Sequence, residues 1–374
     1  MEALRNCRIF DGERFISSHA VLTENGKIIC VCREDDERIQ TAHKLDLGGA
    51  LLVPGFLDLQ ANGGGGVLFN DSPSPKTVMK IYEAHRKGGT ALMCPTFITD
   101  SEEKLHRAIQ AVDETAERII PALHIEGFFI SEKKSGIHNK DFIISPTPHA
   151  ISSILSQGKR KKIFTVAPEV FESTNGDFPM LQMLTAANCT VFGGHTDAEC
   201  DTFLRFLKCG GAGATHLYNA MSGLSARKPG AIGAVLTCEK GFSGIIADGY
   251  HVDYACVRLA KKTLGDRLFL VTDAMPPACS DMREYKLQGQ TIKADDGVCR
   301  SEDGVIAGSC LSMIQAVRNC IIHCDISAEE AIKMASLYPA LAIGKTDTGR
   351  ICAGYDAAFT VTNENFTEAE GMVM

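Results

Sequence analysis

The sequence has no excess of positive charge. Its 374 residues include 38 Lys and Arg against 46 Asp and Glu, which gives a formal net charge of −8. Proteins that bind nucleic acid or an anionic membrane surface usually present a basic face to phosphate groups. We therefore expect no nucleic acid and no membrane as partners. The hydrophobic content of 45% and the charged content of 22% are those of an ordinary globular protein, which excludes a disordered or coiled-coil chain.

Long apolar segments are also absent. No run approaches the ~18 apolar residues that a membrane-spanning helix needs, and the first ten residues, MEALRNCRIF, contain no apolar signal-peptide core. These absences favour a cytoplasmic protein, in which the 15 cysteines are expected to be reduced thiols. The pairs Cys30/Cys32 and Cys320/Cys324 lack a second pair at zinc-finger spacing, so we interpret both pairs as packing residues.

The glycine runs match neither of two common nucleotide-binding motifs. Residues 62–66 (NGGGG) are not followed by the Lys-Ser/Thr of a phosphate-binding loop. Residues 209–214 (CGGAGA) lack the third glycine of a dinucleotide-binding fingerprint. We interpret both runs as tight turns, where the backbone could approach a ligand closely.

Eight short apolar runs are present, and longer helix-like stretches separate them. One such stretch begins at Ser101, which suits a helix N-cap and precedes acidic residues and apolar residues at helical spacing. Asp197–Leu207 and Ser327–Ala335 follow the same pattern. Strands that alternate with helices indicate an α/β protein with a parallel sheet, and eight units fit a (β/α)8 barrel of the TIM type. The eight runs are Val53–Gln60, Thr90–Phe97, Pro121–Gly127, Ile163–Glu169, Thr190–His195, Ala212–His216, Phe242–Asp248 and Leu268–Asp273.

The two ends of the chain differ from this pattern. The first 52 residues contain short strand-like runs with turn signals at Asp11-Gly12 and Asn25-Gly26. The segment Ala357–Thr362 near the other end is again strand-like. We therefore expect residues 1–52 and 346–374 to form a small β-sandwich beside a barrel of residues 53–345.

Polar residues stand at the C-terminal ends of the predicted strands. In a (β/α)8 barrel the strand C-termini line the active site, so Glu126, His195, His216 and Asp273 should converge from four strands. Two imidazoles and one carboxylate are a ligand set of catalytic zinc sites, and a further acid nearby is what metal-assisted hydrolysis requires. Periodicity alone also fits an open doubly wound sheet, but these positions favour the barrel. The residues at the strand ends are Gln60 with Asn62, Thr96, Glu126, Glu169, His195, His216, Asp248 with His251, and Asp273.

Each of these residues also has a simpler structural interpretation. A single His at a strand end is often a hydrogen-bonded core residue, and Asp273 could cap a helix that begins at Ala274. His124 lies two residues before Glu126, on the same strand face, and we assign it a packing or supporting role. We favour a metal hydrolase because four such residues occur at four equivalent strand ends.

Several stretches of the sequence are similar to one known family. VPGFLD at residues 53–58 resembles the first-strand signature of the amidohydrolase superfamily, and THLYNAM at residues 215–221 resembles its N-acetylglucosamine-6-phosphate deacetylase family. The stretches LHIEG, KSGIHN, VAPE, GHT, GIIADG, HVD, VTDA and GS match the same family, and the resemblance runs from about residue 5 to the end. It implies hydrolysis of N-acetyl-D-glucosamine 6-phosphate to D-glucosamine 6-phosphate and acetate in amino-sugar catabolism. It also implies the β-sandwich built from both chain ends.

The resemblance implies a role for individual residues. Glu126, His195 and His216 would hold the metal, Asp273 would be the catalytic acid and base, and His138 would polarise the acetyl oxygen. In the family an arginine reaches into the neighbouring subunit to bind the 6-phosphate, and Arg227 matches it, which implies a homodimer. The residues implied in substrate binding are His138, Asn219, Ala220, Arg227, His251, Ile306, Ala307 and Gly308.

Two departures from the family pattern qualify these implications. Gln60-Ala61-Asn62 stands where most superfamily members carry His-x-His. Because amides are poor zinc ligands, we expect one divalent metal per subunit, with Zn²⁺ preferred over Fe²⁺, Co²⁺ or Mn²⁺. Phe128-Phe129 stands where the family often has Pro-Trp, which leaves the acyl-group tolerance open. Three alternatives stay open: the galactosamine isomer as substrate, another amidohydrolase activity, and a non-catalytic scaffold.

Overall fold

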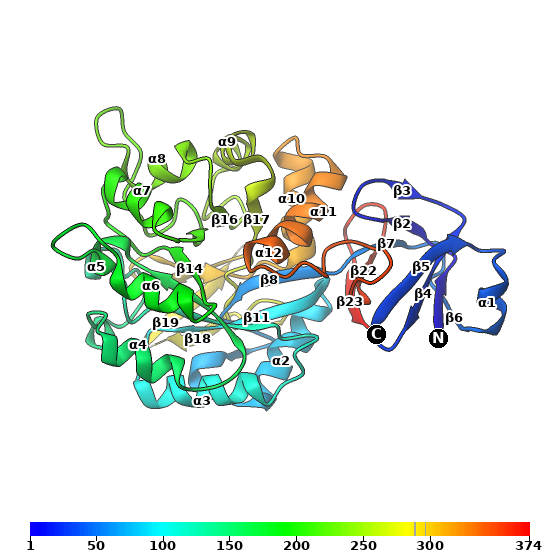
Figure 1. Ribbon diagram of the computed structural model, residues 1–374, viewed down its shortest axis with the longest axis horizontal. Coiled ribbons are helices and arrows are strands. Elements are labelled where there is room, and N and C mark those ends of the chain that lie inside the picture. Colours follow the sequence, from blue (N-terminus) through cyan, green and yellow to red (C-terminus); the bar gives the residue numbers. More distant parts are fainter. Residues whose placement is uncertain (288, 296) are drawn as a thin grey trace.

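The centre of the protein is an eight-stranded parallel barrel (Figure 1). The computed structural model describes residues 1–287, 289–295 and 297–374. Neighbouring barrel strands follow one another in sequence, as in a TIM barrel, and each of the eight predicted apolar runs contributes one strand to the barrel. The strands are β8 (Phe56–Ala61), β11 (Thr90–Ile98), β12 (Ala122–Glu126), β13 (Lys161–Val166), β14 (Thr190–Gly193), β15 (Gly213–Ala214), β16 (Phe242–Ile245) and β17 (Leu268–Leu270). The predicted (β/α)8 architecture is confirmed.

Hydrogen bonds between the first strand and the segment that follows the last strand close the barrel. The backbone N–H of Asp273 donates to the Gln60 carbonyl at 2.9 Å. The fully buried Asp58 carboxylate accepts from the Thr272 hydroxyl at 2.5 Å and from the Thr272 N–H at 3.2 Å. These contacts join β8 to the segment after β17, so the alternative of an open doubly wound sheet is wrong.

Helices surround the barrel, and several of them begin at a side-chain N-cap. Ser101 accepts from Lys104 N at the start of α3, whose buried residues recur at helical spacing. Ser327 caps α11 in the same way, as predicted, whereas the helix predicted from Asp197 begins at Cys200. The main helices are α2 (Pro75–Arg86), α3 (Glu102–Asp113), α4 (Pro148–Leu155), α5 (Pro168–Phe171), α6 (Pro179–Ala186), α7 (Cys200–Lys208), α8 (Gly230–Thr237), α9 (Tyr254–Leu264), α10 (Met313–His323), α11 (Ala328–Ala335) and α12 (Leu337–Ala342).

The two chain ends share one sheet beside the barrel, where the N- and C-termini lie close together (Figure 1). Strand β22 (Ala358–Thr362) pairs antiparallel with β7 (Leu51–Pro54), and β7 pairs parallel with β2 (Arg8–Phe10). A second sheet contains β5 (Lys27–Arg33), β4 (His19–Glu24), β1 (Glu2–Arg5) and β6 (His43–Asp46), and an apolar cluster around Leu4, Ile9 and Phe359 includes side chains from both sheets. The remaining strands of the first sheet are β3 (Phe15–Ile16) and β23 (Ala369–Val373). The predicted pairing of the two ends is confirmed, while the domain boundaries at 52/53 and 345/346 stay predictions.

Two details of the predicted strands were wrong. The run Val53–Gln60 is divided between two sheets, because β7 ends at Pro54 and the barrel strand β8 begins at Phe56. Glu169, predicted at the end of a barrel strand, lies in α5, where its carboxylate accepts from the Thr196 hydroxyl and the Asp197 N–H. Glu169 therefore holds the loop that follows His195.

A four-stranded antiparallel sheet follows the last barrel strand and was not predicted. It is joined to the barrel mouth because Met275 N donates to the Ser309 carbonyl and Ser309 N donates to the Asp273 carbonyl. Its strands are β18 (Glu284–Leu287), β19 (Gln290–Asp295), β20 (Val298–Ser301) and β21 (Ile306–Ser309).

Two further predictions concern membranes and cysteines. Within the described ranges, no helix has the length and apolar character to cross a membrane. All 15 cysteines are free in the structure, and their reduced state in solution stays a prediction.

Candidate metal centre and active-site pocket

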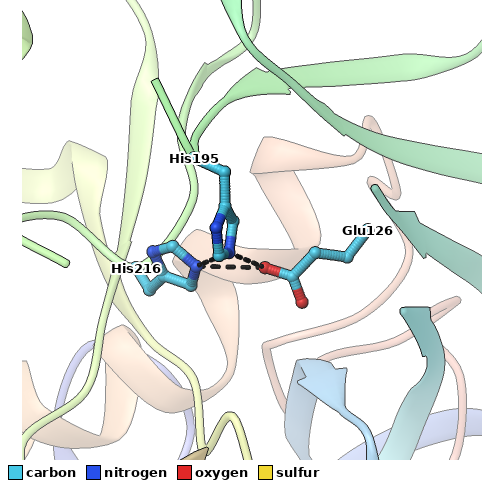
Figure 2. Close-up of side chains that lie close together, drawn as sticks. All are labelled: Glu126, His195 and His216. Carbon is cyan, nitrogen blue, oxygen red and sulfur yellow. Dashed lines mark hydrogen bonds and ion pairs between the residues drawn. The ribbon is translucent and has the colours of Figure 1, made fainter. Parts of the chain in front are cut away.

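Three polar side chains meet at the carboxyl ends of barrel strands (Figure 2). Glu126 is the last residue of β12, and His195 and His216 follow the ends of β14 and β15 by two residues. His216 Nε2 lies 3.0 Å from Glu126 Oε1 and 3.1 Å from His195 Nε2, and His195 Nε2 lies 3.3 Å from Glu126 Oε1. All three residues are buried. The structure thus brings together the three residues that were expected to hold a metal.

The backbone is left-handed at several of these positions. The φ angle is 47° at His195, 28° at His216 and 48° at Asp273. Such a conformation costs about 1–3 kcal/mol at a residue other than glycine and concentrates at functional sites. The turn that follows each strand therefore directs the side chain over the barrel mouth at a cost in stability.

The donor set fits a divalent metal ion. His195 Nδ1 lies 2.8 Å from the Lys134 carbonyl, so the ring proton sits on Nδ1 and the Nε2 lone pair faces Glu126. Although burial raises the pKa of Glu126, its contacts with His195 and His216 hold that pKa well below the usual value, so the carboxylate is anionic. Two imidazole nitrogens and a carboxylate oxygen suit zinc. In the described parts of the chain, no second group of three His, Cys, Asp or Glu side chains meets in this way.

Two amides, Gln60 and Asn62, contact the acids of this site. Gln60 Nε2 lies 3.0 Å from both carboxylate oxygens of Glu126 and 3.1 Å from Asp273 Oδ1, and Asn62 Nδ2 lies 2.7 Å from Asp273 Oδ1. If either amide were turned, its oxygen would face a carboxylate oxygen, so the N–H groups must point at the acids. The two amides therefore orient the two acids.

Asp273 and His138 have shifted proton affinities. Burial and the nearby Glu126 carboxylate raise the pKa of Asp273 to about 6. Burial and the neighbouring His195 lower the pKa of His138 to about 3, so its imidazole is neutral. The His138 and His195 rings lie 4.4 Å apart between centroids. An acid that titrates close to neutrality is suited to proton transfer, and a neutral imidazole is suited to hydrogen-bond donation.

These residues line one cavity of about 480 Å³. This volume is within the range of about 300–1,000 Å³ that is typical of small-molecule sites. Ten of the twelve residues predicted for the site line the cavity: Glu126, His138, His195, His216, Asn219, Ala220, His251, Asp273, Ile306 and Gly308. The other lining residues are Asn62, Ile98, Lys133, Lys134, Gly136, Ile137, Met275 and Val305.

Comparison with known proteins supports a specific family. A model of the amidohydrolase family matches residues 51–373, and a model of the NagA composite domain matches residues 1–52. An N-acetylglucosamine-6-phosphate deacetylase from Haemophilus influenzae is 34% identical over 97% of this chain and 96% of its own length. This chain belongs to the amidohydrolase family. Members of that family are metal-dependent, in agreement with the buried Glu126, His195 and His216 cluster.

Two further relatives define the branch of the family. An N-acetylgalactosamine-6-phosphate deacetylase from a Shewanella species is also 34% identical to this amidohydrolase, over 91% of this chain and 87% of its own length. The crystal structure of N-acetylglucosamine-6-phosphate deacetylase from Pasteurella multocida has a TM-score of 0.92 at 32% identity and covers 100% of this chain and 98% of that chain. The resemblance to the deacetylases, first inferred from sequence motifs, is confirmed over the whole chain.

Three predicted substrate residues have distinct positions in this amidohydrolase. His251 Nδ1 lies 2.6 Å from Asp248 Oδ2, which leaves Nε2 for the cavity. Arg227 is exposed in the loop between β15 and α8 and lies outside the cavity, in a separate hollow that Lys134 also lines. Ala307 is fully buried among the apolar side chains of the β18–β21 sheet, and its carbonyl accepts from the Tyr285 hydroxyl.

Phe128 and Phe129 do not line the cavity. Phe129 is fully buried and packs against Phe171, and Phe128 stacks on Phe97 with 6.3 Å between ring centroids. Both rings therefore belong to the core of this amidohydrolase. Any effect of this departure on acyl-group tolerance would be indirect.

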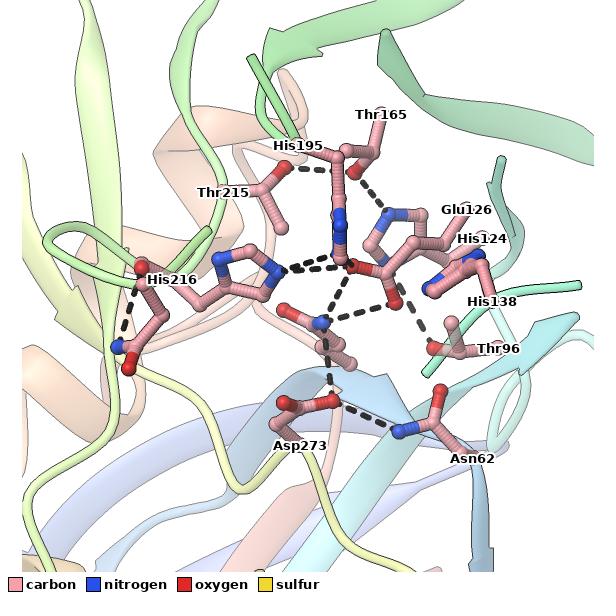
Figure 3. A network of polar contacts seen from close by, with 12 residues as sticks. Asn62, Thr96, His124, Glu126, His138, Thr165, His195, Thr215, His216 and Asp273 are labelled. Atoms are coloured by element: carbon pink, nitrogen blue, oxygen red, sulfur yellow. Dashed lines mark hydrogen bonds and ion pairs between the residues drawn. The ribbon is translucent and has the colours of Figure 1, made fainter. Parts of the chain in front are cut away.

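His124 has the structural role that the sequence suggested. Its Nδ1 lies 3.0 Å from the Leu59 carbonyl, and its Nε2 lies 2.8 Å from the Thr165 hydroxyl, which in turn lies 2.6 Å from the Thr215 hydroxyl (Figure 3). Burial lowers the pKa of His124 to about 4, so the ring is neutral. Both ring nitrogens are engaged, so His124 supports the barrel interior and is not available as a ligand.

Sequence reasoning missed several cavity residues, and Thr99 beside them. Lys133 and Lys134 lie in a polar stretch after β12, and Met275 and Val305 belong to the segment around the unpredicted β18–β21 sheet. Thr99 follows β11, which ends one residue beyond the predicted Thr90–Phe97 run. If the strand had been predicted to end at Ile98, Thr99 would have been recognised as a polar residue at a strand end.

Substitution of Gly127 by Ala is expected to destabilise the protein. Gly127 has a φ of 128°, and a Cβ there would lie 1.8 Å from Thr99 Oγ1. Backbone strain and the clash together should cost about 3 kcal/mol. The matched control is Gly48→Ala, because Gly48 has a φ of 62° but nothing within 4 Å of the added Cβ. Thermal unfolding of both variants tests this, and equal losses would show that the contact with Thr99 is unimportant.

Proposed function

We propose that this amidohydrolase hydrolyses the acetamide of N-acetyl-D-glucosamine 6-phosphate to D-glucosamine 6-phosphate and acetate. The observation that carries this proposal is a buried Glu126, His195 and His216 cluster that shares one cavity with Asp273. The deacetylases to which the chain is similar over its full length supply the substrate class.

The proposed cofactor is one divalent metal per subunit, with Zn²⁺ preferred and Fe²⁺, Co²⁺ or Mn²⁺ as alternatives. Glu126, His195 and His216 would hold it. When bound, such a metal polarises a carbonyl oxygen and lowers the pKa of water toward neutrality. The proposal of a single metal rests on Gln60 and Asn62, whose N–H groups face carboxylates and cannot act as ligands.

Asp273 is the proposed proton carrier. Its pKa of about 6 leaves it mostly ionised at neutral pH, so it can accept a proton from the attacking water. The water oxygen bonds to the acetyl carbon, the carbon–nitrogen bond breaks, and Asp273 returns the proton to the leaving amine. The neutral imidazole of His138 donates a hydrogen bond to the oxygen on which negative charge develops.

The remaining predicted residues would bind the sugar phosphate. Asn219 and Ala220 line the cavity in the loop after His216, and Ile306 and Gly308 line it from β21. We assign the 6-phosphate to His251 and to Arg227 of a second subunit, because a guanidinium can bind phosphate through two hydrogen bonds. Ala307 would contribute through the conformation of β21. This assignment requires a homodimer.

Two further features belong to the proposal. We place the enzyme in the cytoplasm, because 15 free thiols suit a reducing compartment. We also propose that residues 1–52 and 346–374 form the sandwich and residues 53–345 the barrel, with β7 running across the first boundary.

Acetate release from N-acetylglucosamine 6-phosphate, measured with metal content on the same sample, tests the proposal. Turnover with about one metal per subunit is expected. Turnover with two metals would contradict the single-metal assignment. No turnover in a metal-loaded sample would reject the substrate and favour a non-catalytic scaffold or another amidohydrolase activity.

The galactosamine isomer is a second candidate substrate. The chain is 34% identical both to a deacetylase of N-acetylgalactosamine 6-phosphate and to one of N-acetylglucosamine 6-phosphate. Comparison of kcat/KM for the two epimers decides between them. We expect the glucosamine epimer to give the higher value.

A further inference from the structure

Thr99 joins three parts of the active site. It follows β11 directly, it is fully buried, and its Oγ1 lies 2.7 Å from His138 Nδ1. The same oxygen accepts from the backbone N–H of Phe128 at 3.2 Å. One hydroxyl group therefore contacts both the turn that follows Glu126 and the loop that carries His138.

The close packing around Thr99 fixes the position of its hydroxyl. A Cβ on Gly127 would lie 1.8 Å from Oγ1, so only glycine lets the turn after Glu126 approach so closely. The backbone of His138 is also fixed, because its backbone N–H donates to the Ser135 carbonyl at 3.0 Å. With Nδ1 at Thr99, Nε2 is the ring nitrogen left for the cavity that His138 lines.

The chemistry of a neutral imidazole decides which atom should donate in the contact between Thr99 Oγ1 and His138 Nδ1. Such a ring carries one N–H, so it can donate from Nε2 only when Nδ1 accepts a hydrogen bond. A hydroxyl can donate to one partner while its oxygen accepts from another. Thr99 Oγ1 lies within hydrogen-bond distance of His138 Nδ1, to which it can donate, and of the Phe128 N–H, from which it accepts. The partner of one ring nitrogen commonly sets the tautomer of the ring.

We propose that Thr99 is a positioning residue whose hydroxyl donates to His138 Nδ1 and so keeps the ring proton on Nε2, facing the substrate. This inference rests on the proposed function, in which His138 donates to the acetyl oxygen. Without the Thr99 hydroxyl, the ring proton of His138 can move to Nδ1 and the ring can rotate. For part of the time no Nε2–H group then faces the substrate.

Three variants test the role of Thr99 in turnover. Thr99→Val should lower kcat about 10- to 100-fold and change KM less than about threefold, because the lost contact orients a group needed in the transition state. Thr99→Ser keeps the hydroxyl and should restore kcat to within about threefold. Thr90→Val is the matched control at the start of the strand that Thr99 follows, since the buried Thr90 hydroxyl has no hydrogen-bond partner, and it should behave as wild type.

A double-mutant cycle separates this role from a general loss of structure. If Thr99 acts through His138, adding Thr99→Val to His138→Gln should cause no further loss of kcat. An equal loss in both backgrounds would overturn the proposal, as would a Thr99→Val enzyme with near-native kcat or a Thr99→Ser enzyme without rescue.

Nitrogen-15 chemical shifts of the histidine rings give a readout that does not depend on turnover. Wild type should show His138 protonated on Nε2, and Thr99→Val should show a changed tautomer ratio. A wild-type His138 protonated on Nδ1 would overturn the proposal even if the enzyme is active. If wild type releases no acetate, the proposed function fails, and the shifts still decide whether Thr99 sets the tautomer. If Thr99→Val does not fold, the wild-type shifts and the kcat of Thr99→Ser remain decisive.

Discussion

Replacement of Asp273 by Asn should lower kcat by about 10²- to 10⁴-fold, the usual contribution of a general acid–base group. An Asn side chain has the same shape, and its Oδ1 can still accept from Gln60 and Asn62, which now donate to Asp273 Oδ1. It cannot take up a proton from water and return it to the amine. Metal content and substrate binding should therefore be retained. Steady-state kinetics and metal analysis of the variant check this, and near-native turnover would overturn the assignment of Asp273.

The raised pKa of Asp273 predicts the acid side of the pH profile. The carboxylate is the active form before the reaction, so kcat/KM of the wild type should fall as the pH drops through about 6. An unperturbed Asp would place this limb close to 4. The raised pKa also means that the folded state binds the proton more tightly than the unfolded chain, so this group makes folding less favourable as the pH rises from 3.8 to about 6. Asp273→Asn lacks this group, so its thermal stability at neutral pH should not be below that of wild type.

The barrel was predictable because strands such as β12 are buried along their whole length, whereas helices such as α3 bury only one face. Strands such as β12 and β13 read as short apolar runs, and amphipathic helices with Ser caps separate them. Strand boundaries were harder to predict, since β7 and β8 form one continuous apolar run in the sequence although each belongs to a different sheet. The β18–β21 sheet alternates buried and exposed residues, as β18 shows, and this period-two pattern was the signal that could have identified it.

The metal cluster was predictable for a topological reason, and its surroundings were not. Strand ends in a barrel meet at one face, so Glu126, His195 and His216 could be brought together from their positions alone. The left-handed backbone at the two histidines leaves no local signature in the sequence. The orientation of Gln60 and the contact between Thr99 and His138 depend on side chains from segments far apart in the chain. Such contacts are set by the assembled barrel, so sequence patterns do not reveal them.

Replacement of His195 by Asn should abolish metal binding and with it turnover. Asn tolerates a left-handed backbone, so the variant can keep the φ of 47° without strain, but its shorter side chain cannot place a nitrogen where His195 Nε2 lies. Loss of one of three protein ligands should lower the metal content below about a tenth of the wild-type value under dialysis, because metal affinity depends on the full ligand set. Metal analysis after dialysis, followed by an acetate-release assay, checks both effects.

His124→Gln is the matched control for this experiment, because His124 is a second buried histidine in the same polar network. Its ring nitrogens face the Leu59 carbonyl and the Thr165 hydroxyl, so its replacement should lower stability but leave the metal content near wild type. The contrast between the two variants is decisive. Metal retained in His195→Asn and lost in His124→Gln would mean that the ion is held by a different set of residues. Metal lost in both would mean that the hydrogen-bonded interior of the barrel, through Thr165 and Thr215, is needed to hold the ligands in place.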